Sequence, residues 1–209
     1  MKRLSLAIIF GCFALAMAAQ EAVRVNYQGA KPTISDFITA YLAPTYGEDG
    51  ECDSEAMNGV RDAWKRYCKG QKQSENVTFT LDNKNGFAVY EYKYWEGACE
   101  FMTRIEMCLW NEADGKHKLF GYNHRFFRDD QYYPGQYDGV TFMRYTNATK
   151  TMKYYTDAGV QAVYEEKAPS VECSFSLPRS GKDIIVTFWD ENGKTAEKTL
   201  KWNGSGFSW

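Results

Sequence analysis

The stretch from Cys99 to Asn111 constrains the fold more than any other part of the chain, because its residues alternate strictly in character. One set of alternate positions is apolar apart from a single threonine: Phe101, Thr103, Ile105, Met107 and Leu109. The set between them is mixed: Met102, Arg104, Glu106, Cys108 and Trp110. Successive side chains of a strand point to opposite faces of a sheet. The pattern therefore predicts a half-buried strand with an apolar face on the core and a mixed, solvated face.

Similar alternation predicts further strands on both sides of this stretch. The expected strands of a main sheet are Val77–Asp82, Phe87–Trp95, Phe101–Asn111, Lys118–Phe127, Val140–Tyr145 and Thr151–Tyr155. Two more alternating runs follow Ala168-Pro169, around Phe175 and Val186. Short dipeptides that favour positive φ separate several of these runs and predict hairpin turns: Asn85-Gly86, Asp114-Gly115, Asn192-Gly193 and Asn203-Gly204.

Before residue 75 the apolar residues follow helical spacing instead. Thr33 or Ser35 can cap a first helix, and Asp53 or Ser54 a second. We therefore expect an α+β fold, with residues 20–209 as a single domain. Two N-terminal helices (residues ~33–70) pack on an antiparallel β-meander (residues ~77–156). The C-terminal β-hairpins (residues ~170–209) either extend this sheet or form a second layer.

Residues 1–19 have the composition of a secretory signal peptide. Lys2 and Arg3 precede an apolar run, and small residues then offer cleavage after Ala18 or Ala19. Cys12 follows a segment that loosely resembles a lipoprotein cleavage box, which is the less favoured alternative. No later segment is apolar enough to predict a membrane span. The sequence thus predicts export to the periplasm or the medium.

Charge argues against nucleic acid as a partner. The chain has 25 basic and 27 acidic residues, and removal of Lys2 and Arg3 leaves 23 against 27, a net charge of −4. Nucleic-acid binding requires a basic surface. His117 and His124 are separated by an odd number of residues, so on one strand they point to opposite faces and do not share a metal. We expect neither a metal nor a cofactor.

Five cysteines remain after cleavage: Cys52, Cys68, Cys99, Cys108 and Cys173. Cys52 and Cys68 flank one expected helix, and Cys99 and Cys108 lie at opposite ends of one expected strand. Both separations are too long for a disulfide. Any disulfide must therefore join different elements, and several of the five are expected to be buried thiols.

Three short strings carry a resemblance: residues 31–34 (KPTI), 105–111 (IEMCLWN) and 113–119 (ADGKHKL). They resemble uncharacterised exported proteins of Bacteroidetes over residues ~20 to ~165. The resemblance implies an envelope or secreted location in a Gram-negative cell. It implies no activity, substrate or catalytic residue.

Two groups of residues are candidate sites. The first is a loop rich in tyrosine and acceptor groups around Pro134-Gly135, with Tyr132, Tyr133, Tyr137 and Asp130 as ligand-binding candidates. Tyrosines among polar residues in a loop are typical of recognition surfaces. The second is a mixed-face cluster of Glu100, Arg104, Glu106 and His124. Nucleophile-elbow, metalloprotease and P-loop motifs are absent, so no catalytic residue is assigned.

These observations favour an exported, non-catalytic binding or interaction protein with a glycan or protein ligand. One alternative is a hydrolase that acts on a glycan or peptide with carboxylates of the mixed sheet face. Another is an envelope structural protein without a small ligand. A pocket with perturbed carboxylates would favour the enzyme, and exposed tyrosine and tryptophan would favour binding.

The apolar face of the expected strand at residues 99–111, and not the cysteines, is expected to stabilise the fold. Ile105→Ala should lower the free energy of unfolding by about 2 to 5 kcal/mol, because it leaves a cavity in the core. Reductant should shift the melting temperature by less than this substitution does. Thermal unfolding of both variants, each with and without reductant, is the measurement, and a larger shift on reduction would contradict the prediction.

Overall fold

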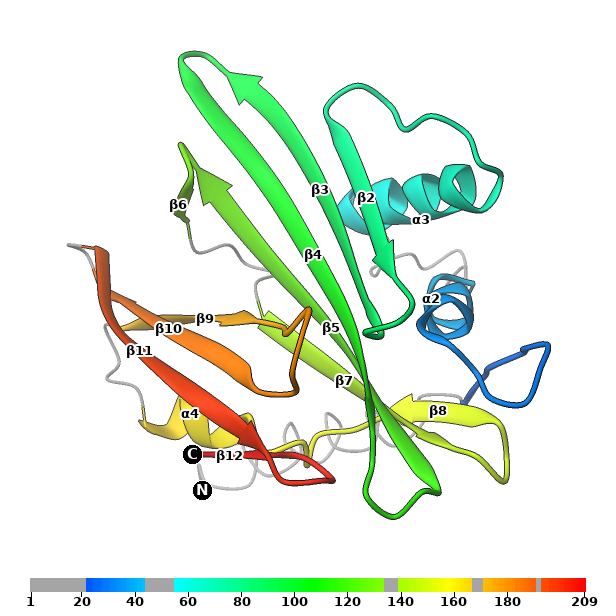
Figure 1. The fold of residues 1–209 in the computed structure, drawn as a ribbon. Coiled ribbons are helices and arrows are strands. Elements are labelled where there is room, and N and C mark those ends of the chain that lie inside the picture. Colours follow the sequence, from blue (N-terminus) through cyan, green and yellow to red (C-terminus); the bar gives the residue numbers. More distant parts are fainter. Residues whose placement is uncertain (1–21, 44–54, 134–138, 167–170, 191–192) are drawn as a thin grey trace, which may run out of the picture.

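A computed structural model describes residues 22–43, 55–133, 139–166, 171–190 and 193–209 (Figure 1). Residues 1–19, for which a signal peptide is predicted and which include Cys12, lie outside these residues, as do Cys52 and Tyr137. The strands form two antiparallel sheets, one of eight strands and one of four. In the first sheet the order is β1-β8-β7-β5-β4-β3-β2, and β6 pairs with β5. In the second the order is β12-β11-β10-β9, so the C-terminal hairpins form a second sheet and do not extend the first.

The described elements have the following bounds. The first sheet consists of β1 (Val23–Arg24), β2 (Val77–Asp82), β3 (Phe87–Glu96), β4 (Cys99–Asn111), β5 (His117–Arg128), β6 (Gln131–Tyr132), β7 (Gly139–Thr146) and β8 (Thr151–Tyr154). The second sheet consists of β9 (Glu172–Ser176), β10 (Ile184–Asp190), β11 (Gly193–Trp202) and β12 (Phe207–Ser208). The helices are α2 (Ile34–Leu42), α3 (Glu55–Cys68) and α4 (Gln161–Glu166).

Strand β4 lies in the interior of the first sheet, between β3 and β5, and pairs with both along most of its length. Two of the expected hairpin turns are present at its neighbours. Gly86 and Gly115 both have a φ of +66°, which residues other than glycine rarely adopt. These turns set the register, so that Tyr90, Ile105 and His124 lie side by side on one face of the sheet.

One face of the first sheet, here called the helix face, packs against α2 and α3. Helix α2 begins after Thr33, whose backbone N–H and Oγ1 both donate to the Asp36 carboxylate, at 2.7 and 2.9 Å. Its residue Phe37 stacks on Phe120 and meets the edge of Tyr145, with ring centroids 6.0 and 5.1 Å away. Ile105 is fully buried in this cluster.

The opposite face, here called the second-sheet face, corrects the expectation of a solvated surface. Glu106, Cys108 and Trp110 are 2–3% exposed, because the second sheet covers this half of β4. A glycine at position 121 makes the close approach possible, since a Cβ there would lie 2.9 Å from the Trp110 ring and 3.0 Å from the Phe142 ring. The expected apolar face is also less uniform than predicted, since Phe101 and Leu109 are only half-buried.

Four of the cysteines lie in the described part of the chain, and none of the four forms a disulfide: Cys68, Cys99, Cys108 and Cys173. The Cys99 and Cys108 thiols are therefore unpaired, in agreement with the distance argument. Burial raises the pKa of the Cys108 thiol, so Cys108 is a packing residue and is poorly suited to act as a nucleophile.

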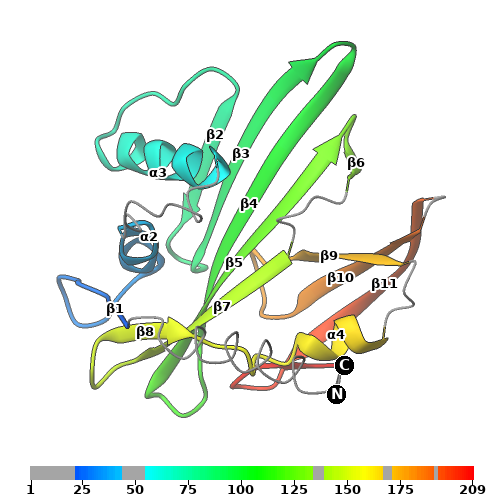
Figure 2. The same ribbon diagram turned by 180° about the vertical axis from the view of Figure 1, so that it is seen from behind.

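The two sheets and the helices leave one end of the long hairpin β3–β4 projecting. Figures 1 and 2 show this end extending past α3 on one side and past the second sheet on the other. Both of its faces carry side chains that the two hydrophobic cores do not cover, and the candidate residues lie here.

Candidate binding surface

The register of β4 and β5 divides the expected mixed-face cluster between two faces. Glu106 lies opposite Asn123, whereas His124 lies opposite Ile105. His124 is therefore on the helix face, and Glu100, Arg104 and Glu106 are on the second-sheet face. The expectation that all four residues share one site was wrong. The even-numbered residues of β5, which include His124, point to the helix face, whereas the odd-numbered ones, such as Asn123 opposite Glu106, point to the second-sheet face.

Glu106 is the centre of a buried ionic network, and its side chain is only 3% exposed. Its Oε1 accepts hydrogen bonds from Nε of Arg104 at 3.0 Å and from a terminal nitrogen of Arg125 at 2.5 Å. Its Oε2 accepts from the Asn123 amide at 3.2 Å and from the backbone N–H of Leu177 at 2.9 Å. Burial lowers the pKa of Arg125, and the nearby Glu106 carboxylate opposes that shift.

This network joins the two sheets. The open edge of β9 meets the face of the first sheet, and its backbone groups find side-chain partners there. Asn123 donates to the carbonyl of Phe175 at 2.7 Å, and Arg125 donates to Oγ of Ser176 at 2.8 Å. Together with the Leu177 N–H, three consecutive residues at the end of β9 and just after it are held by side chains of the first sheet. At this end of an edge strand, the Phe175 carbonyl and the Leu177 N–H thereby gain hydrogen-bond partners.

The remaining carboxylates of this face are also in ion pairs. Glu91 accepts from Arg104 at 2.7 Å, and Glu100 accepts from Lys93 at 2.8 Å. The hydrogen bond to Glu100 raises the pKa of Lys93. A general acid or base needs a carboxyl group that can exchange protons with a substrate. Glu106, with four donors on two oxygens, has a structural position, and nothing in this network favours the hydrolase.

The candidate residues of the tyrosine loop also point to different faces of the first sheet. Tyr132 lies beside Phe127 on the second-sheet face, and its ring is 5.2 Å from Trp189 of β10. Tyr133 points to the helix face, where its ring is 6.2 Å from Phe126. Asp130 is exposed, with a φ of +61° in the turn before β6. Tyr137 falls outside the described residues, so its prediction stays open.

Tyr133 ends a row of five rings that sequence reasoning did not single out. We call it the aromatic row: Tyr92, Tyr94, Phe101, Phe126 and Tyr133. The first four rings are stacked, with neighbouring centroids 5.4–5.6 Å apart and planes within 12–24°. The signal for it was present in the sequence, since aromatic residues alternate with charged ones in β3. Only the register across three strands brings Phe101 and Phe126 beside them.

The aromatic row lies mostly outside the hydrophobic cores. Among the described residues, Tyr92 is the one member of the row that packs against the cluster beneath the helices. Tyr94, Phe101 and Phe126 are half-buried, and Tyr133 is 49% exposed. The Arg128 guanidinium lies 5.9 Å from the centre of the Phe101 ring. The row is thus a continuous apolar strip at the projecting end of the sheet.

A third group, Glu112, Asp114 and His117, could offer three ligand atoms within 4.8 Å of one another. Arg144 already occupies this position, since it donates to both carboxylate oxygens of Glu112 at 2.7 and 2.5 Å. His117 Nδ1 is 2.5 Å from the Asp114 carboxylate, and this hydrogen bond lowers the pKa of Asp114 to about 2. A dication beside a guanidinium would meet strong repulsion, so the group is an ion-pair cluster and not a favourable metal centre.

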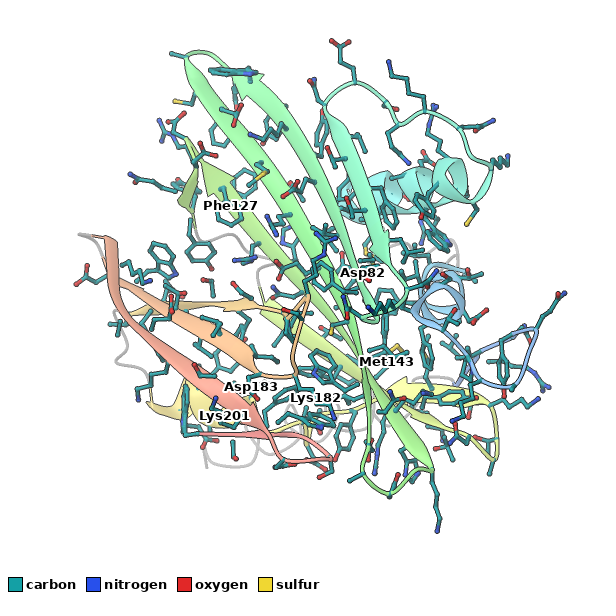
Figure 3. The ribbon with its side chains drawn as sticks, in the orientation of Figure 1. Asp82, Phe127, Met143, Lys182, Asp183 and Lys201 are labelled. Atoms are coloured by element: carbon teal, nitrogen blue, oxygen red, sulfur yellow. The ribbon has the colours of Figure 1, made fainter. Side chains whose placement is uncertain are left out.

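An open hollow of about 420 Å³ lies on the second sheet, with Lys182, Asp183 and Lys201 on its wall (Figure 3). Asp183 accepts from Lys201 at 2.7 Å and from the backbone N–H of Trp202 at 3.0 Å. The hydrogen bond from Lys201 lowers the pKa of Asp183. Two of the charged side chains on the wall, Asp183 and Lys201, are thus already paired with each other, which makes the hollow a weaker candidate than the aromatic row.

Glu106→Ala is expected to lower the free energy of unfolding by about 3 to 5 kcal/mol, because it leaves the Arg125 guanidinium, whose side chain is 13% exposed, without its carboxylate partner. Glu91→Ala is the matched control, since Glu91 also pairs with Arg104 but its side chain is 27% exposed. Loss of that exposed pair should cost about 1 kcal/mol or less. Urea denaturation of the two variants measures the difference, and equal losses would show that the network does not join the sheets.

Comparison with protein-family models, curated proteins and solved structures finds no match to this chain. None of the described helices is both long enough and apolar enough to cross a membrane. The surface described above is therefore the basis for assigning a function.

Proposed function

We propose that this protein is an exported, non-catalytic binding protein whose ligand lies across the aromatic row. The observation that carries the proposal is the row itself, a strip of five neighbouring rings left partly exposed at the projecting end of the first sheet. Contiguous exposed apolar patches on proteins of this size commonly mark interaction sites. Aromatic residues, and tyrosine in particular, provide large contact areas at low conformational cost.

Folding does not account for the row. The cluster beneath α2 and α3 is complete without Tyr94, Phe101, Phe126 or Tyr133, and the cluster between the sheets uses residues of the opposite face. A sheet that served the core alone could end near Tyr92. The additional length of β3 and β4 instead holds the rings in a fixed arrangement, with Asp129 tied to the Glu100 backbone by hydrogen bonds of 2.8 and 2.9 Å.

The surroundings of the row support binding over hydrolysis. Two carboxylates near this end of the sheet, Glu91 and Glu100, are held in ion pairs on the opposite face. Asp129 accepts a backbone hydrogen bond from Glu100 and lies 3.8 Å from Arg128. A glycosidase needs two carboxyl groups facing each other across a substrate, whereas Glu91 and Glu100 lie on the face opposite the row.

Export is the second part of the proposal and rests on the signal-peptide composition of residues 1–19. Expression of the full chain in a Gram-negative host should yield a processed protein that begins at Ala19 or Gln20, since cleavage follows Ala18 or Ala19. Intact-mass measurement of the periplasmic and secreted fractions tests this. A product that retains residue 1, or one that begins with a lipid-modified Cys12, would contradict it.

To test binding, a glycan and peptide array is first used to find a ligand. Tyr133→Ser should then weaken the affinity of the protein for that ligand. A loss of about 2 kcal/mol, equivalent to roughly 30-fold in dissociation constant, is typical of an interface hot spot. The free energy of unfolding should change by less than about 1 kcal/mol, since the side chain is half exposed. Titration of the array hit against purified wild-type and variant protein is the measurement.

Tyr154→Ser is the matched control for this experiment. Tyr154 lies on β8, away from the projecting end, and is 43% exposed against 49% for Tyr133. The control should leave affinity unchanged. Equal effects of the two substitutions, or a hit insensitive to both, would place the binding surface elsewhere.

A further inference from the structure

We propose that the ligand of the aromatic row is a neutral, extended glycan chain, with its sugar rings lying along the row. This inference rests on the proposed binding function and goes beyond it by naming the chemical class of the ligand. Three features carry it: the overlap between neighbouring rings, the use of the backbone beneath them, and the pairing of charges around them.

Neighbouring rings of the row overlap only in part. Aromatic carbons in contact are about 3.5–4.0 Å apart, whereas the centroids of neighbouring rings in the row are 5.4–5.6 Å apart. Nearly parallel rings at that separation must be displaced sideways by roughly 4 Å. Each ring therefore covers only part of the next, and Tyr94, Phe101 and Phe126 are half-buried. A pyranose ring presents C–H groups on its faces, and these pack on an open aromatic face.

The repeat of the row also suits a chain of sugars. The step from one ring to the next is close to the length of one hexose unit in an extended glycan, so a single chain can contact successive rings. Three of the five members, Tyr92, Tyr94 and Tyr133, carry phenolic hydroxyl groups. A phenol can donate and accept hydrogen bonds, which matches the hydroxyl groups around the rim of a sugar ring.

The backbone beneath the row argues against a peptide that adds a strand. Peptides that bind sheets by strand addition need an edge with unpaired N–H and C=O groups. Tyr94 is paired with Phe101, and Thr103 with Phe126, within the β3–β4–β5 ladder. The middle of the row, at Phe101 and Phe126, therefore offers side chains on the face of the sheet and no free backbone edge. Pairing of β3 with β2 ends at Tyr92, so only the β3 end of the row borders an outer edge.

Charges around the row favour a neutral ligand. Arg128, which lies against Phe101, has Asp129 3.8 Å away and donates to Sγ of Cys99 at 3.0 Å. On the other face of the same hairpin, Lys93 is paired with Glu100. No excess of positive charge is present near the row among the described residues, and the processed chain has a net charge of −4 (23 basic against 27 acidic). An acidic polysaccharide would be repelled.

The test uses defined oligosaccharides and the full processed protein. The probes are hexasaccharides of glucose, xylose and mannose as neutral chains, and a hexasaccharide of galacturonic acid as an acidic chain. Isothermal titration calorimetry at low and high salt measures affinity. At least one neutral chain should bind with salt-independent affinity, shorter chains of the same sugar should bind more weakly, and the acidic chain should not bind.

Two variants locate the site on the row. Phe101→Ala removes a central ring and should weaken binding of the neutral chain by more than tenfold, and Tyr133→Ser removes the exposed end of the row. If Phe101→Ala prevents folding, Tyr133→Ser provides the same test at an exposed position. Trp95→Ser is the control, because Trp95 is 67% exposed on the same hairpin but lies opposite Glu100, on the other face. It should bind as the wild type does.

The outcomes separate this inference from the proposed function. If no neutral chain binds but a peptide-array hit depends on Tyr133, the ligand is not a glycan and the binding function stands. Salt-sensitive binding of the acidic chain would overturn the neutral ligand alone. If a glycan binds and only Trp95→Ser weakens it, the opposite face is the site and both proposals fail.

Discussion

The arrangement of this protein depends on one buried carboxylate, that of Glu106. Its two oxygens accept from Arg104, Arg125, Asn123 and the Leu177 backbone, so a single side chain of the first sheet pairs with two guanidinium groups and also binds the chain just after β9. Glu91 supplies a second carboxylate to Arg104. A charged group buried without partners would be strongly destabilising. The second sheet can pack on the charged part of this face because Glu106, Arg104 and Arg125 form ion pairs with one another or with Glu91.

The fixed position of the second sheet decides which surfaces remain open. It covers one half of the second-sheet face, and the helices cover one half of the helix face, so the projecting end of β3 and β4 stays free on both sides (Figures 1 and 2). On one side of this end the charges are paired with one another. On the other side the aromatic row remains as a partly exposed strip of rings. The proposed ligand is a glycan because sugar rings can pack on such a strip.

Several elements could be predicted from the sequence because the signal is local. Alternation in β4 and its neighbours, with Gly86 and Gly115 at turns that need positive φ, was enough to place the strands within a residue or two. The N-terminal cap at Thr33 follows from its own side-chain chemistry. The candidate residues were harder. His124 and Glu106 looked like neighbours, and Tyr132 and Tyr133 looked like one site, but in each case the two members point to opposite faces.

The sequence by itself determined the mainly antiparallel strands, the hairpin turns and the fact that Cys99 and Cys108 do not form a disulfide with each other, because these follow from spacing along the chain. Only the tertiary structure decided that the mixed face of β4 is buried, since a solvated charge and a charge paired with residues of another sheet have the same local pattern. It also decided the aromatic row, which takes its rings from β3, β4, β5 and the residue after β6. Cross-strand register brings these residues together, and register is a property of the folded sheet as a whole.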